Sequence, residues 1–109
     1  MIAGGRRDRL IRFERATTVT DDNGFEQPAW AELERAWANI NFGRGEERRG
    51  ASRENVEITA TFRVLTTANV RGLTPKDRLV TEEDGRVWDI TSAVPFGHAE
   101  YDVTAIWSA

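Results

Sequence analysis

The segment from Asp77 to Ile90, which reads DRLVTEEDGRVWDI, constrains the fold more than any other part of the chain. Its centre, Asp84-Gly85, is typical of a type I′ turn, the two-residue connection that joins antiparallel strands and needs positive φ angles. One register satisfies this turn, a cross-strand ion pair and an apolar face together, so the segment predicts a β-hairpin. The opposed residues are Glu83 with Arg86, Thr81 with Trp88, and Leu79 with Ile90; one face carries Leu79, Thr81, Trp88 and Ile90, and the other carries Arg78, Val80, Glu82, Val87 and Asp89.

Alternation of apolar and polar residues predicts further strands. It is most regular from Val56 to Val64, where every second residue is apolar. Residues 9–15 and 101–107 alternate in the same way. Asn23-Gly24 adds a second turn signal between two extended segments.

Residues 29–42, AWAELERAWANINF, fit two structures. Trp30, Leu33, Trp37 and Ile40 follow the spacing of a helical stripe, and Ala, Glu, Leu and Arg are good helix formers. The alternative is an irregular pair of extended segments with a bend between them. Local signals on their own favour the helix.

These elements amount to five or six short strands joined by turns, with at most one short helix. No strand–helix–strand rhythm is present, so we expect an antiparallel sheet that is closed into a small barrel or folded as a sandwich. A length of 109 residues fits one compact domain spanning 1–109. The predicted fold class is therefore all-β: a small antiparallel β-barrel of five to six strands with one long loop.

Composition excludes most catalytic and metal-binding chemistry. The sequence has no cysteine, which removes disulfides, thiolate metal sites and cysteine nucleophiles. The single histidine, His98, lies in an expected turn with no nucleophile or second ligand nearby, so we expect an exposed turn residue. The acidic clusters fall in expected turns or loops, which favours solvated charge over an acid–base pair. We predict no catalytic, cofactor or metal site, and a protein that is not an enzyme.

Overall charge and hydropathy favour a soluble protein. No apolar segment resembles a secretory signal or approaches membrane-spanning length, so we expect synthesis in a cytoplasm and no membrane contact. The formal net charge of −3 gives no general case for nucleic-acid binding. Of the basic residues only Lys76 is a lysine; arginine suits bidentate contacts to phosphate or carboxylate, although a GC-rich coding bias explains the same composition.

Residues 43–54, GRGEERRGASRE, form the most distinctive connection. They combine glycines with charges and no large apolar residue, which indicates a long loop or a short helix with glycine at each end. Long loops on a rigid scaffold are often functional, and clustered arginines suit contact with phosphate or with a partner's acidic face. A solvated linker is the alternative. The candidate site residues are Arg44, Glu46, Glu47, Arg48, Arg49 and Arg53.

Short motifs follow one another along nearly the whole chain: AGGRRDRLIRFER at the start, DDNG and then Trp30, AWANI at 36–40, GRGEE at 43–47, the alternating strand at 56–64, GLTPKDRLV at 72–80, and DGRVWDI at 84–90. Their order and spacing resemble the head–tail joining family of tailed phages, also called head-closure or stopper proteins. Gene transfer agents, which are domesticated phage particles of bacteria, carry similar proteins.

This resemblance implies a small antiparallel β-barrel that assembles into a homo-oligomeric ring beneath the portal and adaptor proteins. Such a ring closes the filled head, retains the packaged double-stranded DNA and presents a surface to tail-terminator and tail-tube proteins. The resemblance implies extended structure over 29–42, so we predict strands there. It places the loop at 43–54 near the central channel. From the composition and position of this loop we hypothesise that its arginines surround DNA phosphates and that its glutamates pair with arginines of neighbouring subunits. The expected location is the head–tail junction of a virion made in the cytoplasm of a bacterial host.

Two alternatives stay open. An adaptor or tail-terminator ring of the same connector shares the location, and an adaptor should be more helical. A small oligonucleotide-binding β-barrel belongs to another class. It would bind DNA in solution with a steep salt dependence, which the net charge of −3 disfavours.

Overall fold

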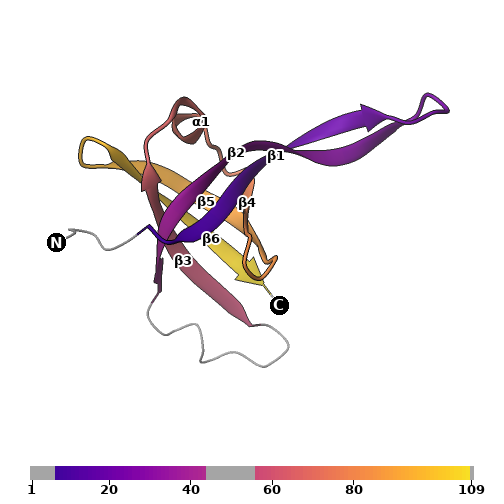
Figure 1. The fold of residues 1–109 in the computed structure, drawn as a ribbon. Helices are drawn as coiled ribbons and strands as arrows, with labels where there is room; N and C mark the ends of the chain where they lie inside the picture. The colour runs from indigo at the N-terminus through magenta and orange to yellow at the C-terminus, as the bar shows by residue number, and fades with distance from the viewer. Residues whose placement is uncertain (1–6, 44–55, 109) are drawn as a thin grey trace.

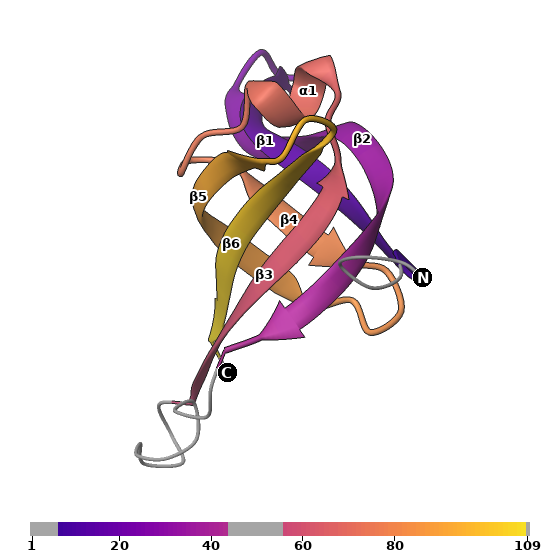
Figure 2. The ribbon, with the colours of Figure 1, turned by 90° about the vertical axis from the view of Figure 1, so that its left-hand side faces the viewer.

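The computed structural model describes residues 7–43 and 56–108, which form six antiparallel strands and one short helix (Figure 1). The sheet is a closed barrel with the strand order β1-β2-β3-β6-β5-β4, so that β4 pairs back onto β1 (Figure 2). The predicted all-β class and the antiparallel barrel are confirmed, and the described residues stay within the prediction of five to six strands and at most one short helix. The elements are β1 (Arg9–Thr20), β2 (Glu26–Phe42), β3 (Glu57–Leu65), α1 (Ala68–Arg71), β4 (Arg78–Thr81), β5 (Val87–Phe96) and β6 (Glu100–Ser108).

Inward side chains from all six strands fill the barrel. Phe62 and Trp88 are among the largest, and their ring centroids lie 5.2 Å apart in an edge-to-face arrangement. That geometry brings the positive edge of one ring to the negative face of the other. The core consists of Ile11, Phe13, Ala38, Ala60, Phe62, Val64, Val70, Leu79, Trp88, Ile90, Val103 and Ala105.

The strands predicted from alternation form where they were expected. β3 and β6 pair along their whole lengths, from Glu57 opposite Ser108 to Leu65 opposite Glu100. In both strands the residues that point into the barrel are more deeply buried than the residues between them. The alternation of apolar and polar residues therefore reflects a barrel wall with one face toward the core and one toward solvent. β1 likewise buries the two apolar residues of the segment 9–15 that lie on its inner face.

Residues 29–42 lie within β2, so the extended structure implied by the family resemblance is correct and the helix favoured by local signals is wrong. The helical stripe misleads because two of its members are not core residues: Trp30 and Trp37 are 41% and 56% exposed. Leu33 is an extra residue in a β-bulge opposite β1. Strand pairing with β1, rather than one buried helical face, decides the structure of this segment.

The β4–β5 hairpin forms, but its predicted register is wrong by two residues. Leu79 lies opposite Trp88, and the N–H of Thr81 donates to the carbonyl of Arg86 at 3.0 Å. The loop is therefore longer than a two-residue type I′ turn. The predicted ion pair between Glu83 and Arg86 does not form, and Glu83 pairs with an arginine of β1 at 2.6 Å instead.

Asp84 explains the longer loop. Its carboxylate accepts hydrogen bonds from the Thr81 hydroxyl and from the N–H of Arg86, the latter at 3.0 Å. In this loop only Gly85 adopts a positive φ, at 72°, whereas a type I′ turn needs two such residues. A shift of two residues preserves the alternation of side chains, so the predicted inner face is correct. The buried residues of that face are Leu79, Thr81, Trp88 and Ile90.

The short helix α1 lies over one end of the barrel, between β3 and β4 (Figure 2). Thr67 caps its N-terminus, where the side-chain oxygen accepts the N–H of Val70 at 3.1 Å. The same hydroxyl donates to Glu34 of β2 at 2.8 Å, and Asn69 donates to that carboxylate at 3.0 Å. These bonds hold Val70 in the core, where it is fully buried. No helix among the described residues is long and apolar enough to cross a membrane.

The substitution Phe62→Ala should lower the free energy of unfolding by about 3–5 kcal/mol, because it leaves a cavity beside Trp88. Urea unfolding followed by circular dichroism measures the loss. Phe25→Ala is the matched control, since Phe25 is 66% exposed. That control should cost less than about 0.5 kcal/mol. Equal losses in the two variants would contradict the placement of Phe62 in the core.

Candidate functional site

Beyond the barrel, β1 and β2 continue as a two-stranded ribbon that stands away from the rest of the molecule (Figure 1). We call residues 16–30 the arm. Its register runs from Ala16 opposite Trp30 to Thr20 opposite Glu26, and Gly24 supplies a φ of 85° in the connecting turn. Nearly all of its side chains are exposed. A two-stranded ribbon is only marginally stable alone in water, so contacts at its base must hold it.

Two cation contacts fasten the arm to the barrel. Arg15 donates to both carboxylate oxygens of Asp77, each at 3.0 Å, and to the carbonyl of Gly72 at 2.9 Å. The guanidinium of Arg78 lies 4.0 Å from the ring centre of Trp30, which is a cation–π contact. The arm therefore leaves the barrel in a defined direction.

Glu14 joins the base of the arm to the barrel wall. It lies on β1 at the bulge and is only 7% exposed. Its two carboxylate oxygens accept from Arg12 and Arg78, each at 2.7 Å, and Arg12 also donates to Glu82 at 2.9 Å. A buried carboxylate is costly unless it is paired. Here the two paired cations come from β1 and β4, the strands whose pairing closes the barrel.

Pairing with arginines keeps the two buried carboxylates at the base of the arm, those of Glu14 and Asp77, charged. Burial raises the pKa of Glu14, but the hydrogen bonds from its two arginines outweigh that effect and hold the pKa below its usual value. Burial also raises the pKa of Asp77, while the hydrogen bonds from Arg15 and from the N–H of Thr74 bring it below its usual value. These two carboxylates at the base of the arm are therefore charged and paired at neutral pH.

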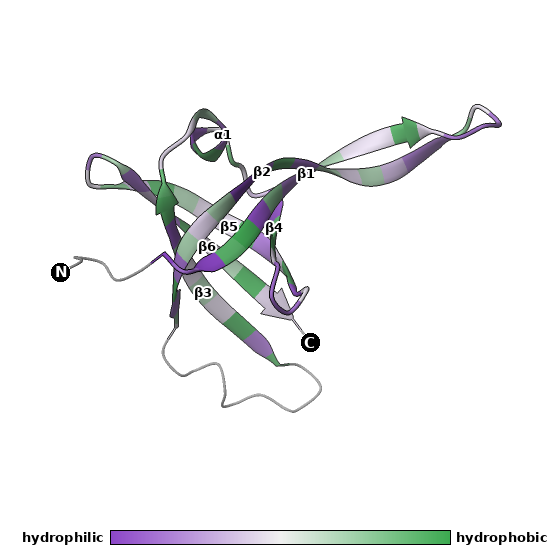
Figure 3. Cartoon of the chain, viewed as in Figure 1, coloured by the Kyte–Doolittle hydropathy of each residue, from purple (hydrophilic) through white to green (hydrophobic). Residues whose placement is uncertain are grey.

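The tip of the arm is acidic and partly apolar, and Figure 3 shows its hydrophilic end. Asp21 closes the turn by accepting N–H groups, including that of Phe25 at 2.9 Å, and this bond is the main cause that lowers the pKa of Asp21. The arm also contains Asp22 and Glu26, and it contains neither lysine nor arginine. Val19 and Phe25 are 51% and 66% exposed beside these acids.

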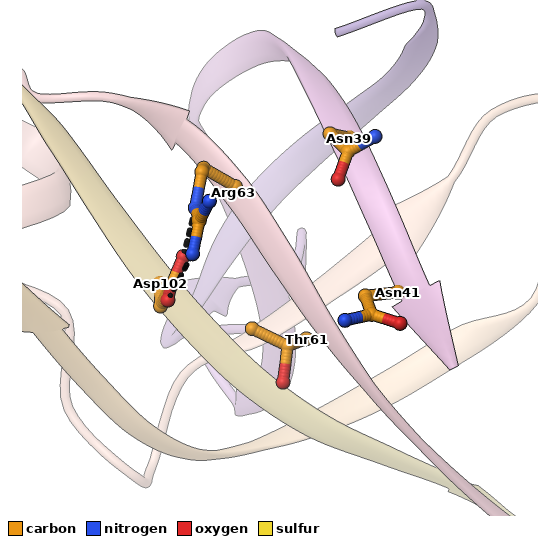
Figure 4. Close-up of a pocket in the computed structure, with 5 residues that line it drawn as sticks. All are labelled: Asn39, Asn41, Thr61, Arg63 and Asp102. Atoms are coloured by element: carbon orange, nitrogen blue, oxygen red, sulfur yellow. Dashed lines mark hydrogen bonds and ion pairs between the residues drawn. The ribbon is translucent and has the colours of Figure 1, made fainter. Parts of the chain in front are cut away.

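A polar pocket of about 340 Å³ lies on the outer surface of the barrel, across β2, β3 and β6 (Figure 4). Arg63 donates through two nitrogens to Asp102, at 2.7 and 2.9 Å, and its guanidinium lies 3.4 Å from the ring centre of Phe96. The charge of Arg63 is thus paired and its position is set. The pocket can accommodate a polar group, but it assembles no nucleophile or general base. Its lining is Asn39, Asn41, Thr61, Arg63 and Asp102.

The site residues predicted from the sequence lie outside the described residues, but the roots of their loop are described. The N–H of Gly43 donates to the carbonyl of Thr59 at 2.8 Å, so β2 and β3 stay joined up to the start of the loop. A Cβ at position 43 would lie 3.2 Å from that carbonyl oxygen, which favours glycine there. The polar pocket begins at Asn41 and Thr61, two positions along each strand from these roots. The predicted residues outside the described ranges are Arg44, Glu46, Glu47, Arg48, Arg49 and Arg53.

No catalytic or metal-binding constellation forms within residues 7–43 and 56–108. No group of three His or acidic side chains in these ranges could hold a metal ion. His98 is exposed in the turn between β5 and β6, as the sequence predicted. The acidic residues at 82–84 are engaged in ion pairs at the barrel surface.

Sequence reasoning missed the arm as a separate feature. It expected extended segments on both sides of Asn23-Gly24 but assigned them no role. One signal was present: residues 16–20, ATTVT, and 26–30, EQPAW, lack the regular large apolar residues of a core strand. Strand-forming residues without a core pattern, on both sides of a turn, indicate a ribbon outside the core.

Comparisons with known proteins identify both a family and solved structures of similar fold. Residues 2–106 match the family model described as phage head completion protein. Among curated proteins no match is found. A chain in the virion of a native gene transfer agent particle has a TM-score of 0.69 and 23% identity over 96% of this chain and 97% of that chain. Protein SF1141 from Shigella flexneri 2a has a TM-score of 0.66 and 16% identity over 95% of each chain. At these identities the two structures support the fold alone.

Acidification should destabilise the protein through Glu14 and Asp77. Both pKa values are lowered in the folded state, so both groups stabilise the folded state when the pH is above their unfolded-state pKa values, which are about 4. That contribution is lost as the pH falls from about 4 through the lowered folded-state values. Urea midpoints measured between neutral pH and about pH 2 should therefore fall.

Glu14→Gln and Asp77→Asn test the assignment. Each variant should be less stable than the parent at neutral pH, because its arginine partners lose an anion, and its midpoint should change less on acidification. Glu57→Gln, a change at an exposed acid opposite Ser108, is the control and should keep the parent profile. Unchanged acid profiles in both variants would argue against this role for the buried carboxylates.

Proposed function

Because this chain belongs to the phage head completion protein family, we propose that it forms a homo-oligomeric ring that closes the DNA-filled capsid and joins it to the tail. The family is one of structural virion proteins, not enzymes, which confirms the prediction of a non-catalytic virion component. The observation that carries the proposal is the family match over residues 2–106, nearly the whole chain. The ring, its place at the head–tail junction and its assembly from chains made in the bacterial cytoplasm are parts of the proposal.

The shape of the subunit supports a connector. The barrel holds two separate features at the two ends of β2: the arm, and the root of the loop at Gly43. A subunit with contact surfaces at both ends of one strand can touch several neighbours at once. In the proposed arrangement the portal or adaptor lies on the head side and a tail-terminator or tail-tube protein lies on the tail side. Packaged double-stranded DNA occupies the channel, and the ring contacts no membrane.

The loop that joins β2 to β3 is the proposed contact with DNA. A ring repeats each side chain around its axis, so a few arginines per subunit make a continuous cationic collar. The two glutamates of the loop would pair with arginines of neighbouring subunits. The residues proposed for the collar and its pairs are Arg44, Glu46, Glu47, Arg48, Arg49 and Arg53.

The alternative connector role of an adaptor has less support. An adaptor was expected to be more helical, and the only helix in the described residues, α1, has four residues. The oligonucleotide-binding barrel also has less support, because the net charge is −3 and the family match points to a virion. A tail-terminator ring of the same connector is distinguished by the layer in which the protein lies.

Cells that lack this chain should produce heads and tails that are not joined to one another. Restoring the chain should restore joined, DNA-filled particles, because the missing ring is the connection between them. Electron microscopy of particles from cells with the gene deleted, and from the same cells supplied with the chain, measures this. Joined particles in its absence would refute the proposed function, and imaging of the junction would show the layer that the chain occupies.

The charge collar has its own test. Arg48→Ala combined with Arg49→Ala should lower the number of DNA-retaining, tail-joined particles, because the collar loses two cations in every subunit. Arg48→Lys with Arg49→Lys is the matched control, which keeps the charge and should retain DNA. If the alanine variant joins tails and retains DNA normally, the collar is wrong, whereas the ring itself is unaffected.

A further inference from the structure

Two basic side chains among the described residues have no acidic partner there. Of the described arginine and lysine side chains, only Arg71 and Lys76 form no ion pair with a described residue. Both are exposed: Arg71 is the last residue of α1, and Lys76 lies in the segment between α1 and β4 that Arg15 binds. The arm carries the opposite excess, since Asp22 and Glu26 are exposed and form no ion pair with a described residue.

These two sets of charges do not meet within one subunit. Arg15 anchors the base of the arm beside the two unpaired cations, through its bonds to Gly72 and Asp77. Asp22 lies in the turn at the far end of the arm, and Glu26 lies beside that turn, opposite Thr20. At about 3.3 Å per strand residue, the tip is roughly 20 Å from Arg15. That separation is several times an ion-pair distance, so the acids of the tip are available to another molecule.

The base of the arm also has a hollow that matches the tip. A pocket of about 220 Å³ lies there, and Lys76 is part of its wall. At the tip, Phe25 is the most exposed of the large apolar residues described, at 66%. An apolar ring flanked by acids is complementary to a pocket flanked by cations. The pocket is lined by Arg15, Ala16, Thr74, Lys76 and Asp77.

The two edges of the arm differ in whether another strand can pair with them. The N–H of Asp21 donates to the carbonyl of Phe25, which makes these residues a hydrogen-bonded pair. By alternation, Thr18 and Pro28 form a non-bonded pair, so the missing N–H of Pro28 faces the outer edge of β2 and blocks strand addition there. No proline interrupts the β1 edge over residues 16–20, and an unprotected edge offers free backbone groups with which another chain can pair.

We propose that the tip of the arm of one subunit docks at the arm base of the next subunit in the ring. Phe25 enters the pocket, and Asp22 and Glu26 lie beside the neighbour's Arg71 and Lys76. Tip and base are different surfaces, so the contact is heterologous and repeats from copy to copy until the ring closes. This inference rests on the proposed function, because a closed ring offers every arm a neighbouring base.

Charge reversal tests the contact in whole particles. Asp22→Lys with Glu26→Lys, and separately Arg71→Glu with Lys76→Glu, should each lower the yield of joined particles by at least about tenfold, because like charges then meet. All four changes together restore opposite charges and should return the yield to within about threefold of the parent. The assay supplies each variant to cells whose own copy of the gene is deleted. Asp21 is left unchanged because it closes the turn.

Asp8→Lys with Glu57→Lys is the matched control, since it reverses two exposed acids away from the arm and should leave the yield unchanged. Thermal unfolding of each purified variant checks that it folds. The docking would be overturned if reversing the charges of Asp22 and Glu26 left the yield of joined particles unchanged. It would also be overturned if the fourfold variant gave no higher yield than either double variant. If particles join without the chain at all, the proposed function fails instead, so the two failures are distinguishable.

Cysteine cross-linking identifies the occupant directly, because the sequence has no cysteine of its own. The double variant Asp22→Cys with Lys76→Cys, oxidised in assembled particles, should give a ladder of disulfide-linked multimers of this chain. Each single variant should give no ladder, since one cysteine per chain links at most two copies. A disulfide closed within one chain, or intact particles without multimers, would overturn the proposal.

Discussion

The ion-paired carboxylate of Glu14 is the interaction on which the rest of the structure depends. It lies at the bulge where β1 passes from the barrel into the arm, and it accepts from Arg12 of β1 and from Arg78 of β4. The pairing of β1 with β4 is the step that turns an open sheet into a barrel. Arg78 also stacks on Trp30 of the arm. One buried anion thus connects closure of the barrel to the direction of the arm. Removing it would leave Arg78 without an acidic partner and Arg12 with Glu82 alone.

The two longest strands serve two environments, and the bulge separates them. On the barrel side, β1 buries Ile11 and Phe13 and follows the ordinary alternation of a half-buried strand. On the arm side the same strand exposes every side chain. Leu33, the extra residue of β2, shifts its alternation at this point and packs against the core. The bulge therefore lets one continuous pair of strands act as core wall and then as a free-standing ribbon.

Sequence patterns predicted the features that depend on the alternation of apolar and polar residues. They failed for features that depend on the contacts of one side chain, such as a strand register. The buried face of the β4–β5 hairpin was correct because any even shift of register preserves it, whereas the register depended on hydrogen bonds made by Asp84. The helical stripe over 29–42 included Trp30 and Trp37, whose exposure no local pattern reveals. Family resemblance, not periodicity, predicted strands there. The predicted site at 44–53 still rests on composition and resemblance, since those residues lie outside the described ranges.

β2 places both proposed contact surfaces on one rigid element. It begins in the arm at Glu26, crosses the barrel wall, and ends at Phe42 beside the root of the loop, so a single hydrogen-bonded strand spans the distance between them. Its two ends are held independently: the arm end by pairing with β1 and by the stacking of Arg78 on Trp30, and the other end by the bond between Gly43 and Thr59. In a symmetric ring the arm contact and the loop root would then keep the same separation in every copy. A loop proposed to surround DNA gains from this constraint, because a collar of charge is uniform only if each subunit presents its loop at the same position on the axis.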